Sequence, residues 1–492
     1  MLTEVLLAAL LLLLLLLVFV NRKPQGLPPG PWGWPVLGKL PSRDLPLAEH
    51  VKALRRTHGD VISWRIGGRI YIFLCNYNVI RAAFTRLEFS SRPDLFSQKA
   101  FTDFTNSGIS FSEGLGWQTH RRFALRQLKD LGMGKSSLES AILQEAQCLV
   151  EDFGEHLGCP EPLPWSIHVA VLNVIWKLTA DRRYDVADQE IQNFNKLISR
   201  SLELFSGAAA LYDLFPWLRS VAPGWLEGRT EVGEYLGIVG NIAEFMAGVI
   251  KEHQESLDPL NPRDYIDSYL LEMEAQQKED PSCTLNLLDL RCGVASLFIA
   301  GTLSVSLTLK AIILHLVKYP EIQKKVQEEL DDAVCADALP TTQDKMSLPY
   351  LEATILECLR VTSLAPLGLA HSAARDTPFE GFVIPKDALI MSHIDCCHTD
   401  PAYWERPLDF YPEHFLDDQG KVLSKRDGFL PFSVGRRVCL GEQLANVELF
   451  IFTAALLKNF SFSAPEGVEV SPRNLFGEQK FVIERRANSK AV

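Results

Sequence analysis

The sequence predicts a mainly α-helical fold with small β-sheets, in a single domain that follows an N-terminal membrane anchor. Three observations lead to this prediction. Apolar residues recur at helical spacing over most of the chain, only two stretches have the β-branched and aromatic character of strands, and the chain begins with an apolar run. With 47% hydrophobic and 22% charged residues, the 492-residue chain can bury a large core.

The apolar run covers residues 5–20, is mostly leucine, and is followed directly by Arg22 and Lys23. Its length suits a spanning helix in a thin bilayer. A cleaved signal peptide is the alternative, but no basic residues precede the run and no small-x-small cleavage site follows it. Basic residues after the run predict that the rest of the chain is cytosolic. The chain therefore divides into an anchor (residues 1–21), a proline-rich hinge (22–41) and the main domain (42–492).

Strands are expected in two places. Residues Val61 to Leu74 form two β-branched and aromatic runs around Gly67-Gly68, a hairpin pattern. A second strand pair is expected between Phe379 and Met391, with its turn at residues 385–387. A sheet that uses both ends of the chain requires one continuous domain. A long, largely buried helix is expected over residues 296–317.

Charge and cysteine content exclude some classes of protein. The net charge of −12 argues against nucleic acid as a partner. Ten cysteines in so long a chain are too few for a dense disulfide framework, so we expect reduced thiols in a reducing compartment.

Cys439 is the centre of the candidate site. Apolar residues after it recur at helical spacing, so a helix should begin near Gly441 and place Cys439 at its N-terminus. Backbone N–H groups and the helix dipole there should lower the thiol pKa. Gly435 allows a turn against a flat ligand, Arg437 can meet an anionic edge, and Phe432 offers an aromatic wall. This combination suits a haem iron with propionates nearby.

The same five residues match the haem-binding signature F-x-x-G-x-R-x-C-x-G of the cytochrome P-450 family, which this chain resembles. The resemblance extends from the proline-rich hinge through Cys439, and it is greatest to the microsomal drug- and steroid-metabolising type, similar to family 2. It implies the cytochrome P-450 fold, haem b as cofactor, and Cys439 as the ligand of its iron.

Other motifs extend this resemblance. Trp117 and Arg121 match W-x-x-x-R, which holds a haem propionate in the family, and His371 matches another propionate-binding position. Glu357 and Arg360 match the buried structural pair E-x-x-R, with His414 as the third partner.

The helix expected at residues 296–317 carries the family pattern A/G-G-x-D/E-T-T/S in altered form. The resemblance implies a catalytic set of Ala300, Gly301, Thr302 and Ser304, in which small residues leave room for dioxygen and Ser304 keeps a hydroxyl. Leu303 replaces the acid that normally relays protons, so proton supply is in doubt. The implied substrate pocket is apolar and comprises Phe101, Phe104, Phe298, Ile299 and Leu367.

The implied function is a monooxygenase that inserts one atom of dioxygen into a lipophilic substrate such as a fatty acid, steroid or xenobiotic. Electrons would come from NADPH through cytochrome P-450 reductase, with cytochrome b5 as a further candidate. A basic stripe of Arg122, Arg126 and Lys129 suits an acidic electron donor. The expected location is the endoplasmic reticulum membrane, with the domain on the cytosolic side. Residues 214–218, LFPWL, resemble a second bilayer contact of the family.

Two alternatives remain open at this stage. Leu303 favours a haem-thiolate isomerase or dehydratase that acts on lipid peroxides without external electrons. A non-catalytic haem sensor is the third class.

Overall fold

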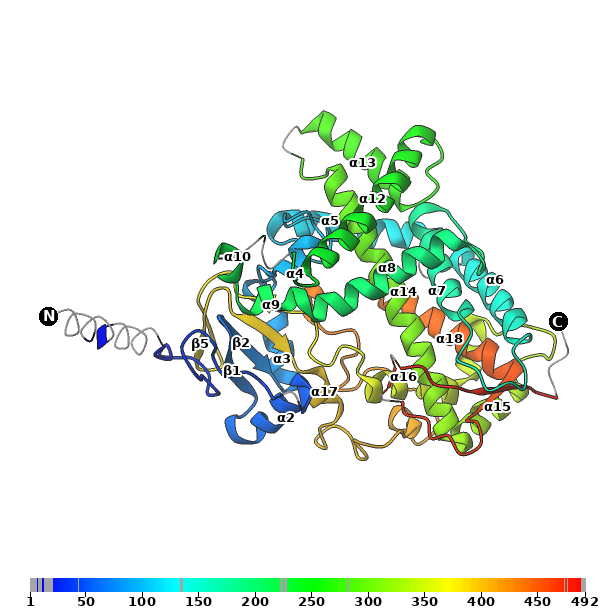
Figure 1. The fold of residues 1–492 in the computed structure, drawn as a ribbon. Helices are drawn as coiled ribbons and strands as arrows, with labels where there is room; N and C mark the ends of the chain where they lie inside the picture. Colours follow the sequence, from blue (N-terminus) through cyan, green and yellow to red (C-terminus); the bar gives the residue numbers. More distant parts are fainter. Residues whose placement is uncertain are drawn as a thin grey trace.

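A computed structural model describes residues 7, 11–12, 21–42, 44–132, 136–221, 224, 228–280, 283–472, 474–475 and 477–487. The predicted anchor, residues 1–21, lies almost entirely outside the described residues. Figure 1 shows a large helical region and a smaller β-sheet region on the side where the chain begins. The prediction of a mainly α-helical fold with small β-sheets is confirmed.

Helices dominate the described chain. The α-helices are α2 Leu47–His58, α3 Tyr77–Phe84, α4 Phe96–Ala100, α5 Gly114–Asp130, α6 Ser136–Phe153, α7 Ser166–Ala180, α8 Gln189–Ser206, α9 Ala208–Leu214, α10 Leu218–Val221, α12 Val232–Ser256, α13 Tyr265–Glu279, α14 Leu287–Lys318, α15 Pro320–Ala333, α16 Pro349–Thr362, α17 Ile394–His398 and α18 Glu442–Asn459. Short 3-10 helices are η1 Leu87–Phe89, η2 Thr342–Ser347, η3 Pro412–Phe415 and η4 Gly435–Arg437.

Helix α14 is the central element of the helical region. The Asn286 side chain caps its N-terminus by accepting from the Asp289 N–H, and Pro320 begins the next helix directly after it. It packs against α7, α12, α16 and α18. Among the described residues it alone is long and apolar enough to cross a membrane, but 56% of its apolar window is buried inside the protein. These contacts identify α14 as a core helix, and the helix predicted at 296–317 lies within it.

The strands form three small sheets. Strands β1 Val61–Ile66 and β2 Arg69–Leu74 pair around Gly67-Gly68, so the predicted hairpin is confirmed. The remaining strands are β3 His371–Ser372, β4 Thr377–Phe379, β5 Phe382–Ile384, β6 Leu389–Ser392, β7 Phe460–Ser463 and β8 Val482–Arg485. The largest sheet has the order β1-β2-β6-β3, with β6 parallel to β2. Its strands come from both parts of the chain, as expected for one domain.

The predicted pairing between residues 379 and 391 is wrong. Strand β5 pairs with β4, whereas β6 lies in the four-stranded sheet. Glu380 and Gly381 both have positive φ, which is the geometry of a tight hairpin turn. Buried residues of β6 instead suit a strand between two neighbours.

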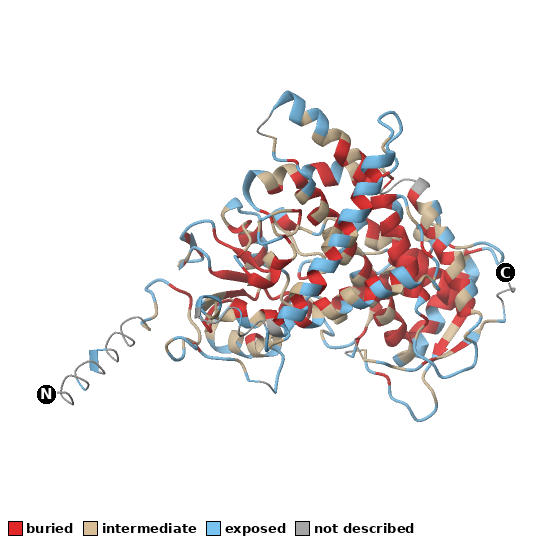
Figure 2. Ribbon diagram, turned by 45° about the horizontal axis from the view of Figure 1, so that its top comes forward, coloured by how far each residue is buried: buried red, intermediate tan, exposed pale blue. Residues whose placement is uncertain are grey.

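The apolar interior has a large cluster among the helices and smaller clusters on either side of the sheet. Figure 2 shows the buried residues concentrated along the inner helices. The candidate site lies where α14, the start of α18 and the sheet region come together.

Candidate functional site

Cys439 lies in a turn that is closed by a backbone hydrogen bond. Its N–H donates to the carbonyl of Phe432 at 3.0 Å, and α18 begins three residues later with Gly441 as its N-cap, as predicted. Gly435 has φ 85°, and a Cβ there would lie 2.1 Å from the Phe84 carbonyl oxygen. Glycine is therefore required by the approach to α3.

The predicted lowering of the Cys439 pKa is wrong for the protein without haem. The Gly441 and Glu442 N–H groups do act in the predicted direction. Although the side chain is solvent-accessible, the protein packed around the thiol desolvates it, and this effect raises its pKa above the ordinary value. The nearby Glu442 carboxylate adds to the increase. A coordinated metal ion would deprotonate such a thiol outright.

A group of cationic and aromatic side chains gathers beside this turn. The Arg437 guanidinium lies 3.8 Å from the centre of the Trp117 ring, and His371 stacks on Phe84 at 3.8 Å between ring centres. Arg121 donates to the carbonyl of Val438 at 2.5 Å, which ties α5 to the Cys439 turn. The structure thus brings together residues from four distant parts of the chain.

Arg92 belongs to this group and was missed from the sequence, where nothing distinguishes it from other arginines. Burial lowers the pKa of Arg92 to about 9, with a further decrease from Arg121. Burial, Arg92 and Arg121 lower the pKa of Arg437 to about 8. Burial, Arg92 and Arg437 also depress the pKa of His371. Buried cations whose pKa values are lowered first by burial and further by one another indicate that a negative charge is missing here.

The polar atoms of this cationic group fit a haem. Among the described residues, no carboxylate forms an ion pair with Arg92, Arg121 or Arg437. These arginines donate hydrogen bonds to backbone carbonyls instead. Trp117 Nε1 and Arg437 Nη1 are buried and have no hydrogen-bond partner in the part of the chain that the structure describes. Two propionates would supply the acceptors that these donors lack, and Cys439 supplies the sulfur for iron.

The predicted triad of Glu357, Arg360 and His414 is present. Arg360 donates to both Glu357 oxygens at 2.7 and 2.8 Å, and His414 Nδ1 lies 3.1 Å from Glu357 Oε1. Both members of the ion pair are 0% exposed. Arg360 also donates to the carbonyls of His398, Pro407 and Asp409. These contacts join α16 to the end of α17, to the segment before η3 and to η3 itself.

The residues predicted on α14 lie on two faces. Ala300 and Ser304 are exposed although the helix is in the core, so this face of α14 reaches solvent. Ser304 Oγ donates to the Ala300 carbonyl at 2.7 Å. Thr302 is buried on another face, and a Cβ on Gly301 would lie 2.5 Å from Ile175 Cδ1. Gly301 therefore permits close packing of α14 on α7.

The predicted pocket residues are similarly divided. Phe298 is 1% exposed and its ring lies 5.1 Å from Trp176 and 5.2 Å from Phe194. Ile299 and Leu367 are half-buried, as is Phe101. Phe104 is 45% exposed. Phe298 therefore belongs to an aromatic cluster of α7, α8 and α14, while the other four reach solvent.

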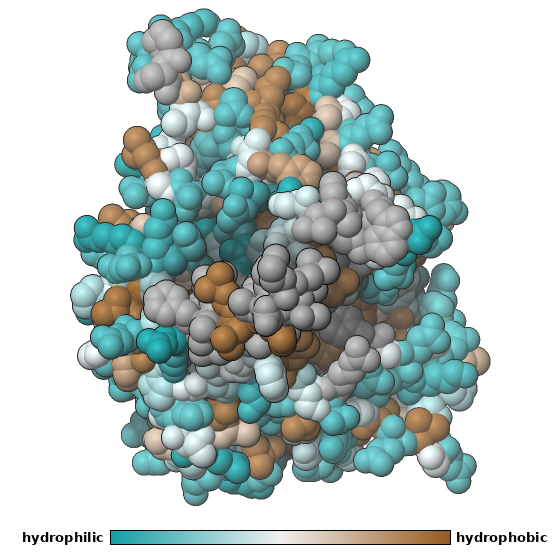
Figure 3. Space-filling view, turned by 60° about the vertical axis from the view of Figure 1, so that its left-hand side comes forward, coloured by the Kyte–Doolittle hydropathy of each residue, from teal (hydrophilic) through white to brown (hydrophobic). Residues whose placement is uncertain are grey.

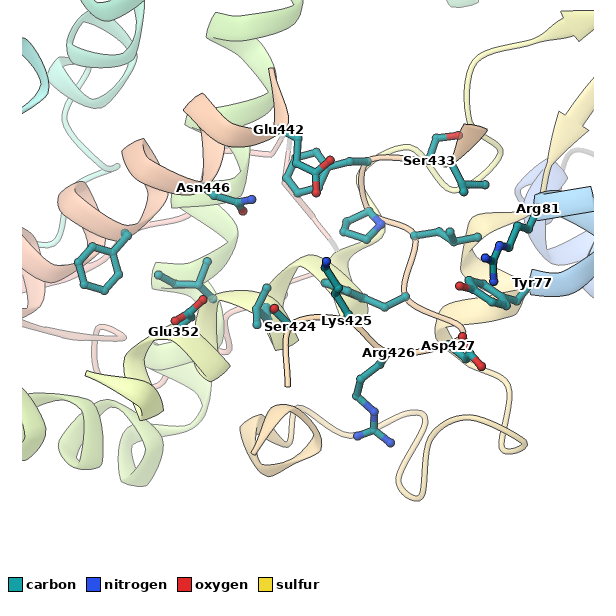
Figure 4. Close-up of a pocket in the computed structure, with 18 of the residues that line it drawn as sticks. Tyr77, Arg81, Glu352, Ser424, Lys425, Arg426, Asp427, Ser433, Glu442 and Asn446 are labelled. Atoms are coloured by element: carbon teal, nitrogen blue, oxygen red, sulfur yellow. The ribbon is translucent and has the colours of Figure 1, made fainter. Parts of the chain in front are cut away.

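A separate groove of about 550 Å³ lies behind the Cys439 turn. Figure 4 shows Lys425 and Glu442 along it, Tyr77 and Arg81 at one end, and Arg426 pointing away. Phe432 and Ser433 form part of its wall, but none of its lining residues among those described comes from α14. The groove therefore does not include the accessible face of α14 that carries Ala300 and Ser304.

Comparison with known proteins agrees with this geometry. A sequence model described as Cytochrome P450 matches residues 28–488. The chain is 49% identical over 449 residues to Cytochrome P450 2L1 of Panulirus argus, covering 91% of each protein. It is 37% identical over 478 residues to Cytochrome P450 2B9 of Mus musculus, covering 95% of each. Cytochrome P450 2B19 of Mus musculus is 36% identical over 457 residues, with 91% of this chain and 90% of that protein covered.

This chain is a haem-thiolate enzyme by fold and site, and it belongs to the cytochrome P450 family. Its relatives carry family 2 names, so the predicted resemblance is confirmed. Membership identifies the protein as a monooxygenase with haem b. The comparisons do not favour the electron-independent alternative.

Proposed function

We propose that the protein oxidises lipophilic molecules at a membrane, with electrons from NADPH delivered by cytochrome P-450 reductase. The observation that carries the substrate class is the accessible, uncharged face of α14. The helix has no charged residue from Cys292 to Leu309, and Ile299 and Leu303 adjoin the accessible Ala300 and Ser304. Such a surface favours an apolar substrate, because an ionised group would lose hydration without a partner.

The described residues would hold the cofactor in a defined way. Cys439 would bind the iron, and Arg92, Arg121, His371, Arg437 and Trp117 would surround the propionates. Bound haem supplies the activation of dioxygen at its iron. The Glu357, Arg360 and His414 triad would keep the neighbouring backbone in place without touching substrate.

Proton delivery would depend on Ser304. Its hydroxyl is on the accessible face, and its hydrogen bond to Ala300 fixes the position of Oγ. Leu303 has no titratable proton, so water in contact with Ser304 would have to replace the proton that the Ser304 hydroxyl gives up. Thr302 Oγ1 is buried on another face of α14 and has no hydrogen-bond partner among the described residues. We therefore assign proton delivery to Ser304 rather than to Thr302.

The electron donor would approach from the side of α5 and the Cys439 turn. Arg122, Arg126 and Lys129 are exposed, although Arg126 pairs with Glu272 at 2.8 Å. Replacing Arg122 and Lys129 with Glu should reduce reductase-supported turnover at low salt by roughly tenfold. Lys278→Glu, on the exposed surface of α13, is the matched control. Equal rates in both variants would argue against this docking side.

A membrane-facing side is supported by exposed apolar residues around the β1–β2 turn. Gly67 and Gly68 donate to the carbonyls of Leu37 and Leu214, so the hinge and the LFPWL segment meet there. Figure 3 looks onto this side of the molecule and shows apolar surface among polar areas. The exposed side chains are Trp34 77%, Leu37 50%, Leu40 51%, Leu211 46% and Trp217 45%. We place this side against the endoplasmic reticulum, with the domain in the cytosol.

A protein lacking residues 2–21 tests this membrane contact. It should remain folded and haem-loaded, and it should still bind phosphatidylcholine vesicles weakly. Trp34→Ser with Trp217→Ser should remove that binding, whereas Leu408→Ser, at a residue 75% exposed elsewhere, should not. A truncated protein that never sediments with vesicles would contradict the contact.

The iron ligand is tested by Cys439→Ser, with Cys159→Ser at an exposed cysteine as the control. The first variant should lose the red-shifted Soret band of the ferrous carbonyl complex, and the second should keep it. Retention of the band in Cys439→Ser would refute the ligand assignment. A screen of fatty acids, steroids and xenobiotics for haem spin-state changes, followed by reductase-dependent product formation, would then identify the substrate.

A further inference from the structure

A buried histidine, His398, connects α16 to the segment that carries Cys439. It is the last residue of α17 and is 0% exposed. Its backbone carbonyl accepts a hydrogen bond from Arg360 Nη1 at 2.5 Å. Its Nε2 lies 2.9 Å from the backbone nitrogen of Leu430, and its Nδ1 lies 2.6 Å from Ser363 Oγ. Both ring nitrogens and the backbone carbonyl of His398 are therefore hydrogen-bonded.

The hydrogen bonds around the His398 ring fix its tautomer. A backbone N–H can only donate, so Nε2 accepts from Leu430 and carries no proton. The proton is then on Nδ1, which donates to Ser363 Oγ, and the Ser363 hydroxyl donates to the Arg360 carbonyl at 3.1 Å. Burial and the Arg360 charge lower the pKa of His398 to about 3, so the ring stays neutral near pH 7. A doubly protonated ring could not accept from Leu430.

Leu430 lies in the chain segment that leads to Cys439. The Leu430 carbonyl accepts from the Ser433 N–H at 3.0 Å. The Phe432 carbonyl in turn accepts from the Cys439 N–H at 3.0 Å. Both of these bonds stay within the segment. The bond from the Leu430 N–H to His398, by contrast, spans 32 positions of the chain and ties the segment to α17.

His315 is a second buried histidine, and its hydrogen bond stays within its own helix. It is 7% exposed, and its Nδ1 lies 2.8 Å from the Ala311 carbonyl in α14. Burial lowers its pKa to about 4, so this ring is also neutral near pH 7. In the described chain its ring contacts Cys358 and Phe410, and not the segment that carries Cys439. His315 therefore offers a matched control for substitutions at His398.

We propose that His398 is a positioning residue for the iron ligand, because its bond to the Leu430 N–H holds the segment that carries Cys439 against α17. Arg360 fixes the backbone of His398, and the His398 ring lies 5.7 Å from the Phe429 ring. Groups that support a metal ligand from outside orient it and tune its binding. The inference rests on the proposed assignment of Cys439 as the iron ligand.

Two conservative variants separate the two ring nitrogens of His398. A Gln side chain places its amide near the position of Nε2, so its oxygen can accept from the Leu430 N–H. An Asn side chain places its amide near Nδ1 and is too short to reach Leu430. His398→Gln should therefore keep the bond to the segment, and His398→Asn should lose it. Ser363→Ala removes only the acceptor of Nδ1 and should leave the Leu430 bond in place.

The first measurement uses the full-length, haem-loaded protein, reduced and bound to carbon monoxide. Loss of the red-shifted Soret band is followed in buffer well below the melting temperature, because this band requires thiolate ligation. His398→Asn should lose the band roughly tenfold faster than the parent. A factor of ten corresponds to about 1.4 kcal/mol, within the range for a buried N–H left without a partner. His398→Gln, Ser363→Ala and His315→Asn should resemble the parent.

Hydrogen exchange gives a second measurement that does not involve the iron. The peptide that contains the Leu430 amide is followed by mass spectrometry in the same haem-loaded proteins. This amide should exchange roughly tenfold faster in His398→Asn than in the parent, because its acceptor is lost. His398→Gln should protect it as the parent does.

The two variants of His398 decide the proposal. Equal behaviour of His398→Asn and His398→Gln in both measurements would overturn it, as would an equal effect of His315→Asn. If His398→Asn does not load haem, recovery of haem loading in His398→Gln supports the positioning role, and failure of both variants overturns it. Retention of the red-shifted band in Cys439→Ser would instead refute the ligand assignment, so the two failures are distinguishable.

Discussion

Two buried arginines, Arg360 of α16 and Arg437 of the Cys439 turn, have opposite surroundings. Arg360 is 0% exposed, and its donors meet the Glu357 carboxylate and three backbone carbonyls. Arg437 is 8% exposed, has no carboxylate partner among the described residues, and retains an unpaired Nη1. The charge of Arg360 is neutralised by a carboxylate of the same chain. The charge of Arg437 would be neutralised only by an anionic ligand.

This difference separates structural charges from binding charges. A buried ion pair within the chain affects the free energy of unfolding mainly when one partner is removed, because the other charge is then buried without compensation. A buried cation left without a partner destabilises the ligand-free protein and strengthens the ligand complex. The two arginines should therefore respond differently to mutation.

The largest effect is expected for Glu357→Gln. The substitution preserves size but leaves the buried Arg360 charge uncompensated, which should cost about 3–5 kcal/mol of unfolding free energy. Urea titration and the yield of haem-loaded protein would measure this loss. Glu328→Gln, in the exposed pair with Lys324, is the control and should change little. Similar stability of the two variants would contradict the structural role of the triad.

Arg437→Leu should act on haem retention instead. Removing a charged donor to a propionate should speed haem transfer to excess apomyoglobin by roughly tenfold or more. The haem-free protein should be no less stable than the parent, because an unpaired buried charge is removed. Arg436→Leu, at the exposed neighbour, should leave haem transfer unchanged. Loss of apo stability with unchanged haem transfer would assign Arg437 to the structural class.

Leu303→Glu tests whether the accessible face of α14 lacks a proton donor. We expect a few-fold more product per NADPH and less peroxide release, since a tenfold faster protonation corresponds to about 1.4 kcal/mol of barrier. Leu303→Gln has a similar size without a titratable proton and should not improve coupling. Tight coupling in the parent enzyme, or equal improvement by Gln, would show that another group supplies the protons.

The smallest effect is expected for the buried pair of His253 and Asp264, whose polar groups are hydrogen-bonded within the chain. His253 Nε2 lies 2.9 Å from Asp264 Oδ2, and both side chains are buried. Burial alone would lower the pKa of His253, but the bonds to Asp264 and to the Val249 carbonyl outweigh it and raise this pKa. The stabilisation is therefore complete below the unfolded pKa of about 6.5 and is lost as pH rises through the folded pKa.

Asp264→Asn removes the charge while its amide oxygen can still cap α13. The variant should lose the decrease in melting temperature that the parent shows as pH rises above about 6.5. Melting temperatures of both proteins at pH 6, 7 and 8 would measure this. Parallel curves would show that the buried pair does not titrate with folding.

Features that depend on neighbouring residues along the chain could be predicted from the sequence. Spacing alone predicted the β1–β2 hairpin, the long helix at 296–317 and the helix after Gly441, whereas the buried E-x-x-R pair was implied by the family resemblance. The five-residue pattern around Cys439 was sufficient to identify the family. These features are local because hydrogen bonds and side-chain contacts within a few residues produce them.

Features that depend on distant segments became evident only in the folded protein. Strand β6 pairs with β2 rather than with β5. The backbone groups of β6 could form hydrogen bonds with any neighbouring strand, so packing between distant segments determines which strand it pairs with. Arg92 joins the cationic group only when the chain folds, and the face of α14 that reaches solvent depends on where α7 packs. The Cys439 pKa is raised because desolvation by the surrounding fold exceeds the local effect of the N–H groups.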